Sequence, residues 1–513
     1  MREKKTDPEF PLLLPFTPGQ ASNGEFVPRA RTREHLEAEA LALEMAEQIA
    51  WKRGIDRRRF LQGAGGIAVT LAAINLVGCD GGDKKSLPPG VTAGGAYDVP
   101  TDADPDAVCE KLAGDEFIFD VQTHHVDPKG PWVKESPATA QFFARFLGGD
   151  PSCAEADKLD CLSRFYYTHD IFLESDTTMA VLSDTPSSVD TQDPLNFDEM
   201  KRTRDIINRL SPPASGRMRL HSVVVPNAGP NALQHQLDRM QARAEAMDVA
   251  AWKLYTPYAP DGKGWFLDDP LLGIPVIEQA RKLGVKTICA HKGLPLFGFD
   301  RAAASPRDIG VVARAYPDMN FVVYHSGWFP GTREGPYDPA NAEVGVNALV
   351  KSLRDNGIKP NANVYAELGS TWRNLMSDTT QAAHVLGKLI KHCGEDNVLW
   401  GTDCIWTGSP QPQIAAFRTF KMDPQFADQH GYLLLTDAVK RKIFGLNAAR
   451  LYGVDPVAQR CKIEKDEIEK LRSTWLDLDG ATHEPRYASR GPTDREGMRR
   501  WFADNGGRWQ LGG

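Results

Sequence analysis

The sequence predicts a (β/α)8 TIM-type barrel, an α/β fold in which eight parallel strands alternate with helices. Eight short runs of apolar or β-branched residues follow one another after residue 115, and amphipathic segments lie between several of them. Strands that alternate with helices pair in parallel, and eight such units close into a barrel. An open doubly wound sheet is the alternative, but no glycine fingerprint for a nucleotide follows the first run.

The predicted strands take their positions from these runs. They cover residues 116–121, 178–183, 219–226, 250–255, 285–290, 319–324, 363–368 and 397–401. Between them, apolar residues recur at three- and four-residue spacing, as expected of helices with one buried face. The predicted helices cover residues 231–247, 271–283, 306–316, 341–356 and 379–393.

The composition is that of a globular protein. The chain has 513 residues, of which 41% are hydrophobic and 25% charged, and its formal net charge is -8. No basic stripe or Lys/Arg block follows residue 100. A nucleic-acid partner is therefore not expected, and the expected partner is a small-molecule substrate.

The N-terminal region has the order of an export signal. Residues 1–55 form an N-terminal extension, and residues 56–79 contain an arginine cluster before Phe60-Leu61, sixteen uncharged residues (63–78) and then Cys79. Sixteen residues are short of the roughly 20 that a membrane span needs. The segment resembles a twin-arginine signal with a lipobox at Cys79. It predicts export by the twin-arginine machinery to the periplasm, with a lipid anchor at Cys79; an ordinary anchor helix is the alternative.

The remaining boundaries follow from composition. Residues 80–112 are predicted to be a linker, 113–455 the barrel and 456–513 a C-terminal extension with one charged helix at 462–473. The insertion at 129–175 is rich in aromatic residues and is predicted to cover the mouth of the barrel as a lid, with simple packing as the alternative. Within it, an oxidising compartment could join Cys153 to Cys161. No Cys-x-x-Cys pair occurs, which argues against a thiolate zinc site.

Polar side chains stand at the ends of four predicted strands. The first strand ends in Gln122 and His124, the fifth in His291, the sixth in His325 and the eighth in Asp403. A barrel brings these ends to one rim. Two or three imidazoles with one carboxylate could hold a divalent metal ion and leave a position open for water. A single histidine in an apolar strand is more often structural, but three at strand ends favour function.

These motifs resemble the amidohydrolase superfamily, in particular the amidohydrolase-related branch that contains hydrolases and aromatic decarboxylases. The resemblance covers residues 116–453 and rests on five motifs in order. They are Asp120-Val121-Gln122-Thr123-His124, His291, His325-Ser326-Gly327, Gly401-Thr402-Asp403 and the terminal segment 442–451. The resemblance implies a metal held by Gln122, His124, His291 and Asp403. It also implies that His325 is an acid/base or substrate-polarising residue and that Asp403 takes a proton from water.

Gln122 departs from the family pattern, which usually has histidine and in some decarboxylases glutamate at this position. An amide oxygen is a neutral and weaker ligand than imidazole. Zinc is the expected metal, manganese or magnesium is the alternative because of Gln122, and a site without a metal is a further one. Asp120 is expected either to support the ligands or to cap the strand, and His125 faces away from His124.

Four further residues are predicted to contact substrate. Lys253 lies on the fourth strand, where binuclear relatives carry a carbamylated lysine; here we favour a substrate carboxylate or an acidic side chain as its partner. Glu367 ends the seventh strand, and Trp328 and Trp406 follow rim strands. Arg373 is a further candidate for the pocket lining. The histidines predicted to be structural are His169, His221, His235, His384 and His392.

Three functions fit these observations. The first is metal-assisted hydrolysis of an amide, ester or lactone bond of a small molecule. The second is metal-dependent, non-oxidative decarboxylation of an aromatic or unsaturated carboxylic acid, and the third is a decayed barrel that acts as a binding protein. Neither the substrate nor the presence of a homo-oligomer follows from the sequence.

Overall fold

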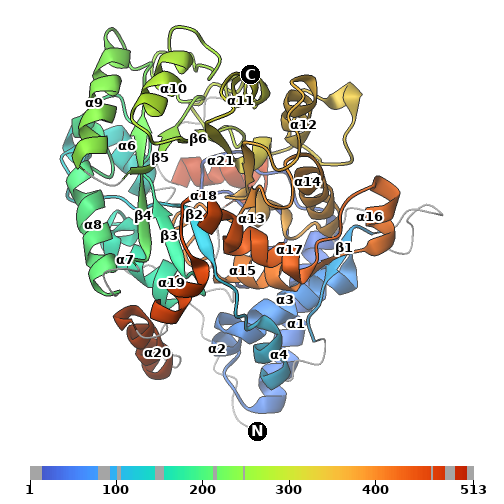
Figure 1. Ribbon diagram of the computed structural model, residues 1–513. Coiled ribbons are helices and arrows are strands. Elements are labelled where there is room, and N and C mark those ends of the chain that lie inside the picture. The colour runs from blue at the N-terminus through green and yellow to red at the C-terminus, as the bar shows by residue number, and fades with distance from the viewer. Residues whose placement is uncertain are drawn as a thin grey trace.

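The computed structural model contains an eight-stranded parallel barrel (Figure 1). It describes residues 14–78, 93–100, 105–144, 155–211, 216–246, 249–463, 466–479 and 492–504. The strands follow one another around the sheet in chain order, which confirms the predicted (β/α)8 class. They are β2 (Phe119–Thr123), β3 (Met179–Leu182), β4 (Met218–Val224), β5 (Val249–Leu254), β6 (Thr287–His291), β7 (Asn320–Tyr324), β8 (Val364–Glu367) and β9 (Val398–Leu399).

The sheet closes between its first and last strands. Val121 N donates to Trp400 O at 3.1 Å, and Asp403 N donates to Gln122 O at 2.9 Å. A parallel bridge also joins Thr123 to Cys404. The chain after β9 therefore runs beside β2, and this contact carries Asp403 to the rim next to Gln122.

Helices surround the barrel, with α8, α9 and α10 along one side and α12 and α14 along the other (Figure 1). All five predicted helices are present within a few residues of their predicted bounds. The helices around the strands are α8 (Phe197–Arg209), α9 (Ala232–Ala246), α10 (Gly273–Lys282), α11 (Ile309–Ala315), α12 (Val346–Asp355), α13 (Thr371–Leu375), α14 (Thr379–His392) and α15 (Gln411–Thr419). After α15 come β10 (Phe420–Met422), α16 (Pro424–His430), α17 (Asp437–Arg441), a π-helical turn at Lys442–Leu446 and α18 (Asn447–Leu451).

Both faces of the barrel strands are buried, and alternate residues belong to different parts of the core. On β6, Cys289 joins the cluster inside the barrel, whereas Ile288 and Ala290 pack in the larger cluster between strands and helices. Because the side-chain period of a strand is two, His291 shares the inner face with Cys289. The strand that is apolar along its length thus ends in an inward-facing imidazole.

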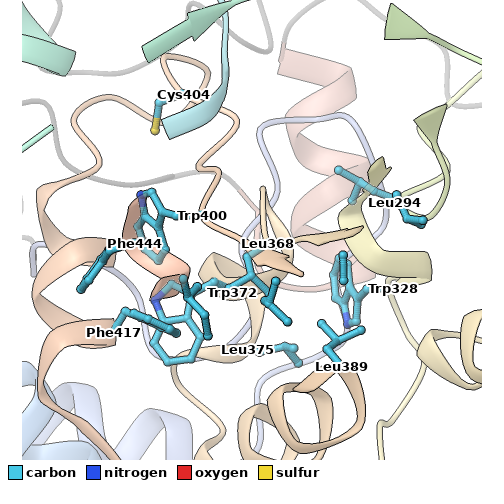
Figure 2. Packing of buried hydrophobic residues seen from close by; sticks show 14 of the residues in the cluster. Leu294, Trp328, Leu368, Trp372, Leu375, Leu389, Trp400, Cys404, Phe417 and Phe444 are labelled. Carbon is cyan, nitrogen blue, oxygen red and sulfur yellow. The ribbon is translucent and has the colours of Figure 1, made fainter. Parts of the chain in front are cut away.

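An aromatic cluster supports the segment that leads to Asp403. The ring of Trp400 lies 5.3 Å from that of Phe417 and 5.0 Å from that of Phe444, and Trp372 packs edge-on against Phe417 at 5.1 Å (Figure 2). All four side chains are fully or almost fully buried. Edge-to-face pairs of this kind fix ring orientation in addition to burying apolar area. The cluster therefore anchors the chain at Trp400, three residues before Asp403.

The N-terminal region is folded against the barrel. After an irregular segment come α1 (Arg33–Arg53), α2 (Arg57–Gln62) and α3 (Ala64–Val77). Four alanines of α1 at four-residue spacing are buried and allow close packing of the apolar face of α3. Among the described residues, no helix combines the length and the apolar character that crossing a membrane requires. Cys79 lies outside the described residues, and export stays a prediction.

The predicted linker contains regular structure. β1 (Gly95–Tyr97) pairs antiparallel with β10, and α4 (Pro105–Leu112) follows it. The C-terminal extension contains α19 (Pro456–Ile463), α20 (Glu467–Asp479) and α21 (Arg495–Asp504). The predicted helix at 462–473 is thus divided, because the chain turns at Asp466. This carboxylate accepts two hydrogen bonds from the buried guanidinium of Arg217, at 2.6 and 2.8 Å.

The insertion after β2 is largely helical. It contains α5 (Trp132–Glu135), α6 (Pro137–Phe142), α7 (Arg164–Thr168) and a π-helical turn at His169–Leu173. Phe143 packs against Trp132 and Trp406 with ring centroids 5.6 and 5.4 Å apart. Cys161 is disulfide-bonded, and Cys153 lies outside the described residues.

Candidate active site

A cavity of about 410 Å³ lies at the carboxyl ends of the barrel strands. Its lining includes four of the predicted site residues at strand ends, together with Trp406 and a wall of aromatic rings. The ends of all eight parallel strands meet at this rim, which brings together residues that are far apart in the chain. The predicted residues in the lining are Gln122, His124, His291, Asp403, Trp406 and Arg373. The aromatic wall consists of Phe142, Phe143, Tyr255, Tyr258, Phe297 and Phe299.

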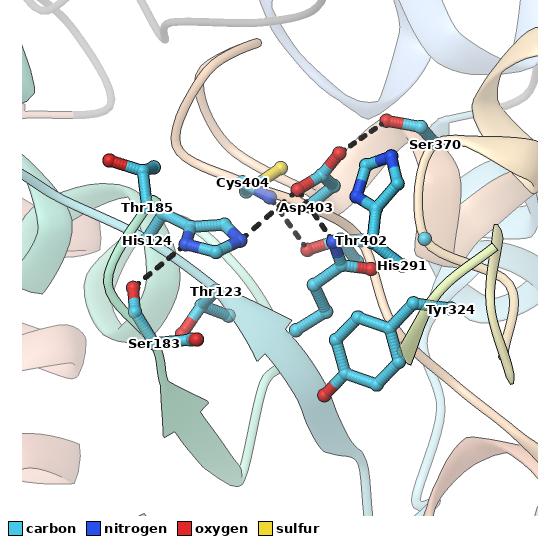
Figure 3. Close-up of polar contacts among 12 residues, drawn as sticks. Thr123, His124, Ser183, Thr185, His291, Tyr324, Ser370, Thr402, Asp403 and Cys404 are labelled. Atoms are coloured by element: carbon cyan, nitrogen blue, oxygen red, sulfur yellow. Dashed lines mark hydrogen bonds and ion pairs between the residues drawn. The ribbon is translucent and has the colours of Figure 1, made fainter. Parts of the chain in front are cut away.

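Asp403 is the most highly connected side chain of the cavity (Figure 3). Its Oδ1 accepts a hydrogen bond from Gln122 Nε2 at 2.9 Å and lies 3.3 Å from His124 Nε2. Its Oδ2 accepts a hydrogen bond from the Ser370 hydroxyl at 2.7 Å. Burial alone would raise the pKa of this carboxyl, but hydrogen bonding by His124 and Ser370 holds it far below its usual range. Asp403 is therefore ionised at neutral pH.

Each of the three rim histidines uses one ring nitrogen to bond a backbone carbonyl. The bonds run from His124 Nδ1 to Ser183 O at 2.8 Å, from His325 Nδ1 to Gly369 O at 2.7 Å and from His291 Nε2 to Leu294 O at 3.1 Å. A carbonyl oxygen only accepts, so the bonded nitrogen carries the proton. The other nitrogen of His291 and of His325 then has a free lone pair, as in metal-ligating histidines, whereas His124 Nε2 faces Asp403 Oδ1.

These two lone pairs face each other. His325 Nε2 lies 3.2 Å from His291 Nδ1. Burial lowers the pKa of His325 to about 4 and holds that of His291 well below its usual value, so both rings are neutral at pH 7. Neither facing nitrogen then has a proton to share. A cation beside them would remove this repulsion.

The side chains of the site are of types that bind divalent cations. They form two separate pairs, His124 with Asp403 and His291 with His325. Within the described part of the chain, no group of three or more His, Cys, Asp and Glu residues is arranged to hold a metal ion. The separation of 3.3 Å between His124 Nε2 and Asp403 Oδ1 equals the roughly 3.3 Å expected between two ligands of a tetrahedral zinc. The chemistry of the residues thus fits a metal, and their common coordination of one ion stays a prediction.

Gln122 is held close to the barrel axis by glycines. Its Oε1 is buried and has no hydrogen-bond partner. A Cβ at Gly369 would lie 2.2 Å from this oxygen, and a Cβ at Gly401 would lie 1.7 Å from Glu367 Oε1. Both positions therefore require glycine. An unpaired amide oxygen in a buried site is destabilising, and a cation would satisfy it.

Asp120 ties β2 to the chain after β9. Its Oδ1 accepts hydrogen bonds from the backbone N–H groups of Gln122 and Thr402, both at 3.1 Å, and its Oδ2 accepts one from the Thr402 hydroxyl at 2.5 Å. Burial raises the pKa of Asp120 to about 7. Its contacts show that it supports the rim, because they fix the backbone on either side of Gln122 and Asp403.

Residues 209–454 match the family model described as Amidohydrolase. The match covers slightly less than half of the chain, and these residues are similar to the amidohydrolase family. No curated protein matches the chain.

Solved structures with a similar fold include three from bacteria. A TIM-barrel protein from Bordetella bronchiseptica is 15% identical, with a TM-score of 0.42 and coverage of 67% of this chain and 99% of that one. A 5-carboxyvanillate decarboxylase from Sphingomonas paucimobilis is 17% identical, with a TM-score of 0.40 and coverage of 66% and 100%. A 5-carboxyvanillate decarboxylase from Novosphingobium aromaticivorans, solved in complex with manganese, is 13% identical, with a TM-score of 0.38 and coverage of 67% and 97%.

The predicted substrate contacts divide into two groups. Trp406 lines the cavity and stacks on His124, with ring centroids 5.3 Å apart and an interplanar angle of 18°. Trp328 is fully buried outside the lining and packs edge-on against Phe26 at 6.4 Å.

Lys253 and Glu367 lie beneath the cavity, and neither is part of its lining. Lys253 Nζ is buried without a hydrogen-bond partner, 3.3 Å from the centroid of the Tyr324 ring, and burial lowers its pKa to about 7. Glu367 accepts hydrogen bonds from His325 N at 3.1 Å and Gly369 N at 2.5 Å. Burial raises the pKa of Glu367 to about 8. Its contacts shape the turn that carries the site.

The other histidines have structural partners or lie on the surface. His125 bonds the Thr203 hydroxyl at 3.0 Å, His221 that of Tyr452 at 2.9 Å and His384 that of Tyr432 at 3.1 Å. His169 forms ion pairs with Asp170 and Glu174, His392 packs near Tyr337, and His235 is exposed on α9.

Sequence reasoning missed Ser370, Tyr255 and Glu25. Ser370 has a φ of 55°, and Leu294, His325, Ser326 and Asp403 also have positive φ. Such conformations in non-glycine residues are strained and often occur at functional sites. No sequence pattern shows them. Tyr255, whose ring lies 5.3 Å from that of His291, is the last residue of the predicted fourth strand and could have been found from its place at the rim.

Proposed function

We propose that this protein is a metal-dependent hydrolase of the amidohydrolase family that cleaves an amide, ester or lactone bond of a small, ring-bearing molecule. One observation carries the proposal. Three imidazoles each bond a backbone carbonyl through one ring nitrogen, and their other ring nitrogens gather in two pairs near the ionised Asp403. Lone pairs and a carboxylate that gather in a buried place favour a bound cation.

His124, His291 and Asp403 would hold the metal, with Gln122 Oε1 as a further ligand. Zinc suits the imidazoles, whereas a neutral amide oxygen beside a carboxylate also suits manganese or magnesium. When bound, a divalent ion lowers the pKa of a coordinated water and polarises a substrate oxygen.

The chain's own residues supply the rest of the chemistry. Asp403 Oδ2 is oriented by the Ser370 hydroxyl at 2.7 Å, and as an ionised carboxylate it can accept a proton from an attacking water. His325 is fully buried and is not part of the cavity lining; its Nε2 lies 3.2 Å from His291 Nδ1, so it would act on the reaction by positioning His291. The aromatic wall, including Tyr255 and Phe299, holds a ring and excludes bulk water.

Decarboxylation is the second candidate. The specific observation in its favour is that a wall of aromatic rings surrounds a cavity of about 410 Å³ that also contains the cationic side chain of Arg373. Such a cavity is suited to an aromatic or unsaturated carboxylic acid. In that reaction the same acid/base residues would have to protonate a ring carbon in place of activating water.

The test begins with elemental analysis of the purified chain. The metal is then removed with a chelator, and zinc, manganese or magnesium is restored separately before a screen of esters, lactones, amides and aromatic acids. Hydrolysis predicts oxygen-18 from labelled water in the product; decarboxylation predicts release of carbon dioxide without that label. Asp403→Asn should lower turnover at least a hundredfold, and His235→Asn, on the exposed face of α9, should leave it unchanged.

A negative result has a clear meaning. If no metal is present in stoichiometric amount, and ligands bind equally well to the native chain and to Asp403→Ala, the barrel is a binding protein and the hydrolase proposal is wrong.

A further inference from the structure

The N-terminal segment before α1 lies along the rim of the cavity. Gly19 N donates to Ser377 Oγ at 2.8 Å, and Asn23 Nδ2 donates to Trp406 O. Phe297 N donates to Glu25 O at 2.9 Å. These contacts join a segment near the start of the chain to three separate loops of the barrel rim. The segment is therefore part of the wall of the site.

Glu25 and Arg373 meet inside this wall. Both side chains line the cavity, and their relative exposures are only 8% and 7%. Glu25 Oε1 lies 3.6 Å from Arg373 Nη2, which is longer than a hydrogen bond. Ser22 Oγ donates to Glu25 Oε2 at 3.1 Å. The two charges are therefore close, but they do not form the paired hydrogen bonds of a close arginine–carboxylate contact.

The guanidinium of Arg373 is only partly satisfied. Nη1 donates to Ala21 O at 3.2 Å, whereas Nε is buried without a hydrogen-bond partner. A buried guanidinium with an unused N–H is suited to a planar carboxylate that accepts two parallel hydrogen bonds. Glu25 also fits its position poorly, because burial raises the pKa of its carboxyl although Arg373 opposes the change.

We propose that Arg373 is the anion subsite of the cavity, that it takes the carboxylate of an aromatic acid, and that Glu25 of the same chain occupies this subsite until such a ligand arrives. The proposal rests on the proposed function because it names the ligand class of the same cavity. Arg373 lies three residues after Ser370, the hydroxyl donor to Asp403, so an acid held there lies beside the reacting side chains.

Occupation by Glu25 has an energetic consequence. A ligand acid must displace an intramolecular carboxylate, so its observed affinity is the intrinsic affinity reduced by the fraction of molecules in which the subsite is open. Removing the carboxylate of Glu25 without changing its shape should therefore tighten the binding of anionic ligands and leave neutral ligands unaffected.

The experiment measures the binding of benzoate and of its neutral analogue benzamide to the full-length, metal-loaded chain by calorimetry. Glu25→Gln should tighten benzoate binding at least fivefold and change benzamide binding less than twofold. Arg373→Met should weaken benzoate binding at least tenfold, and the gain from Glu25→Gln should disappear in the double variant. Glu44→Gln, on the exposed face of α1, is the matched control and should change neither.

The Glu25→Gln variant keeps the proposal falsifiable if Arg373→Met does not fold, because it removes a buried carboxylate without creating a cavity. Unchanged benzoate affinity in Glu25→Gln overturns the proposal, as does an equal gain for benzamide. Binding at equilibrium is independent of turnover. If benzoate affinity changes in the variants as predicted but no substrate is turned over, the hydrolase proposal is wrong and the subsite proposal stands. If a substrate is turned over but benzoate affinity does not change in Glu25→Gln, the subsite proposal is wrong and the hydrolase proposal stands.

Discussion

The free ring nitrogens of His291 and His325 face each other at 3.2 Å, and the opposite nitrogen of each ring donates to a backbone carbonyl. With both rings neutral, this arrangement places two lone pairs in contact in a buried site. Relief comes from a proton, which the lowered pKa values oppose, or from a cation.

The first prediction concerns metal and stability. Zinc added to the metal-free chain should raise its thermal unfolding midpoint, because a ligand at one hundred times its dissociation constant stabilises a folded protein by about 2.7 kcal/mol. His291→Asn should lose most of this shift, since it removes an imidazole lone pair. His235→Asn should keep it. An equal shift in the His291 variant would show that zinc binds elsewhere.

The second prediction concerns Gln122, whose Nε2 donates to Asp403 while its Oε1 is unpaired. Gln122→His replaces a neutral amide by an imidazole and should tighten zinc binding about tenfold or more. Competition with a fluorescent chelator measures the change, and Gln122→Ala, which offers no ligand, serves as the reference. If the histidine variant binds zinc as the native chain does, Gln122 is not a ligand.

The residues on the strands were largely predictable, because a period of two with buried faces fixes both a strand and its inner side. The order of the strands placed His291 and Glu367 at strand ends and Lys253 on the fourth strand. It does not give depth along the barrel axis, so it did not distinguish the lining of the cavity from the layer beneath it. The carbonyls of Ser183 and Gly369 accept hydrogen bonds from the ring nitrogens of His124 and His325. They belong to the backbone, so no residue type in the sequence could have predicted these contacts.

The N-terminal region shows a second limit. An uncharged apolar run of this length indicates a signal segment, an anchor or a buried helix equally well, because periodicity alone does not separate them. In the structure, this apolar run forms α3, which packs against the alanine face of α1. Glu25 was missed for a related reason: the contact between Glu25 and Arg373 depends on how the extension crosses the rim, which no local pattern specifies.

The third prediction concerns the C-terminal extension. Arg217 and Asp466 form a fully buried pair with two hydrogen bonds, so Asp466→Ala leaves an uncompensated buried guanidinium. Such a change costs about 3 to 5 kcal/mol in the free energy of unfolding, which urea denaturation measures. Glu467→Ala, which breaks only the exposed pair with Lys470, should cost about 1 kcal/mol or less. Equal effects of the two substitutions would contradict the role given to the buried pair.

The fourth prediction is a pH dependence of stability at His169. Burial opposes its charge, but hydrogen bonds and charges from Asp170 and Glu174 raise its pKa to about 9, above the ordinary 6.5. Because the folded value exceeds the unfolded one, the stabilisation is complete below pH 6.5 and is lost as the pH rises through 9. The difference in unfolding free energy between the native chain and His169→Gln should fall by about 2 kcal/mol between pH 7 and pH 9.5.

The matched control for this pH series is His384, a buried histidine whose pKa is shifted in the opposite direction. Burial lowers the pKa of His384 to about 3, so its ring is neutral throughout the range from pH 7 to pH 9.5. The difference between the native chain and His384→Gln should therefore stay constant over that range. A constant difference for His169→Gln as well would show that its imidazole is neutral between the two carboxylates, which would contradict the ion pair.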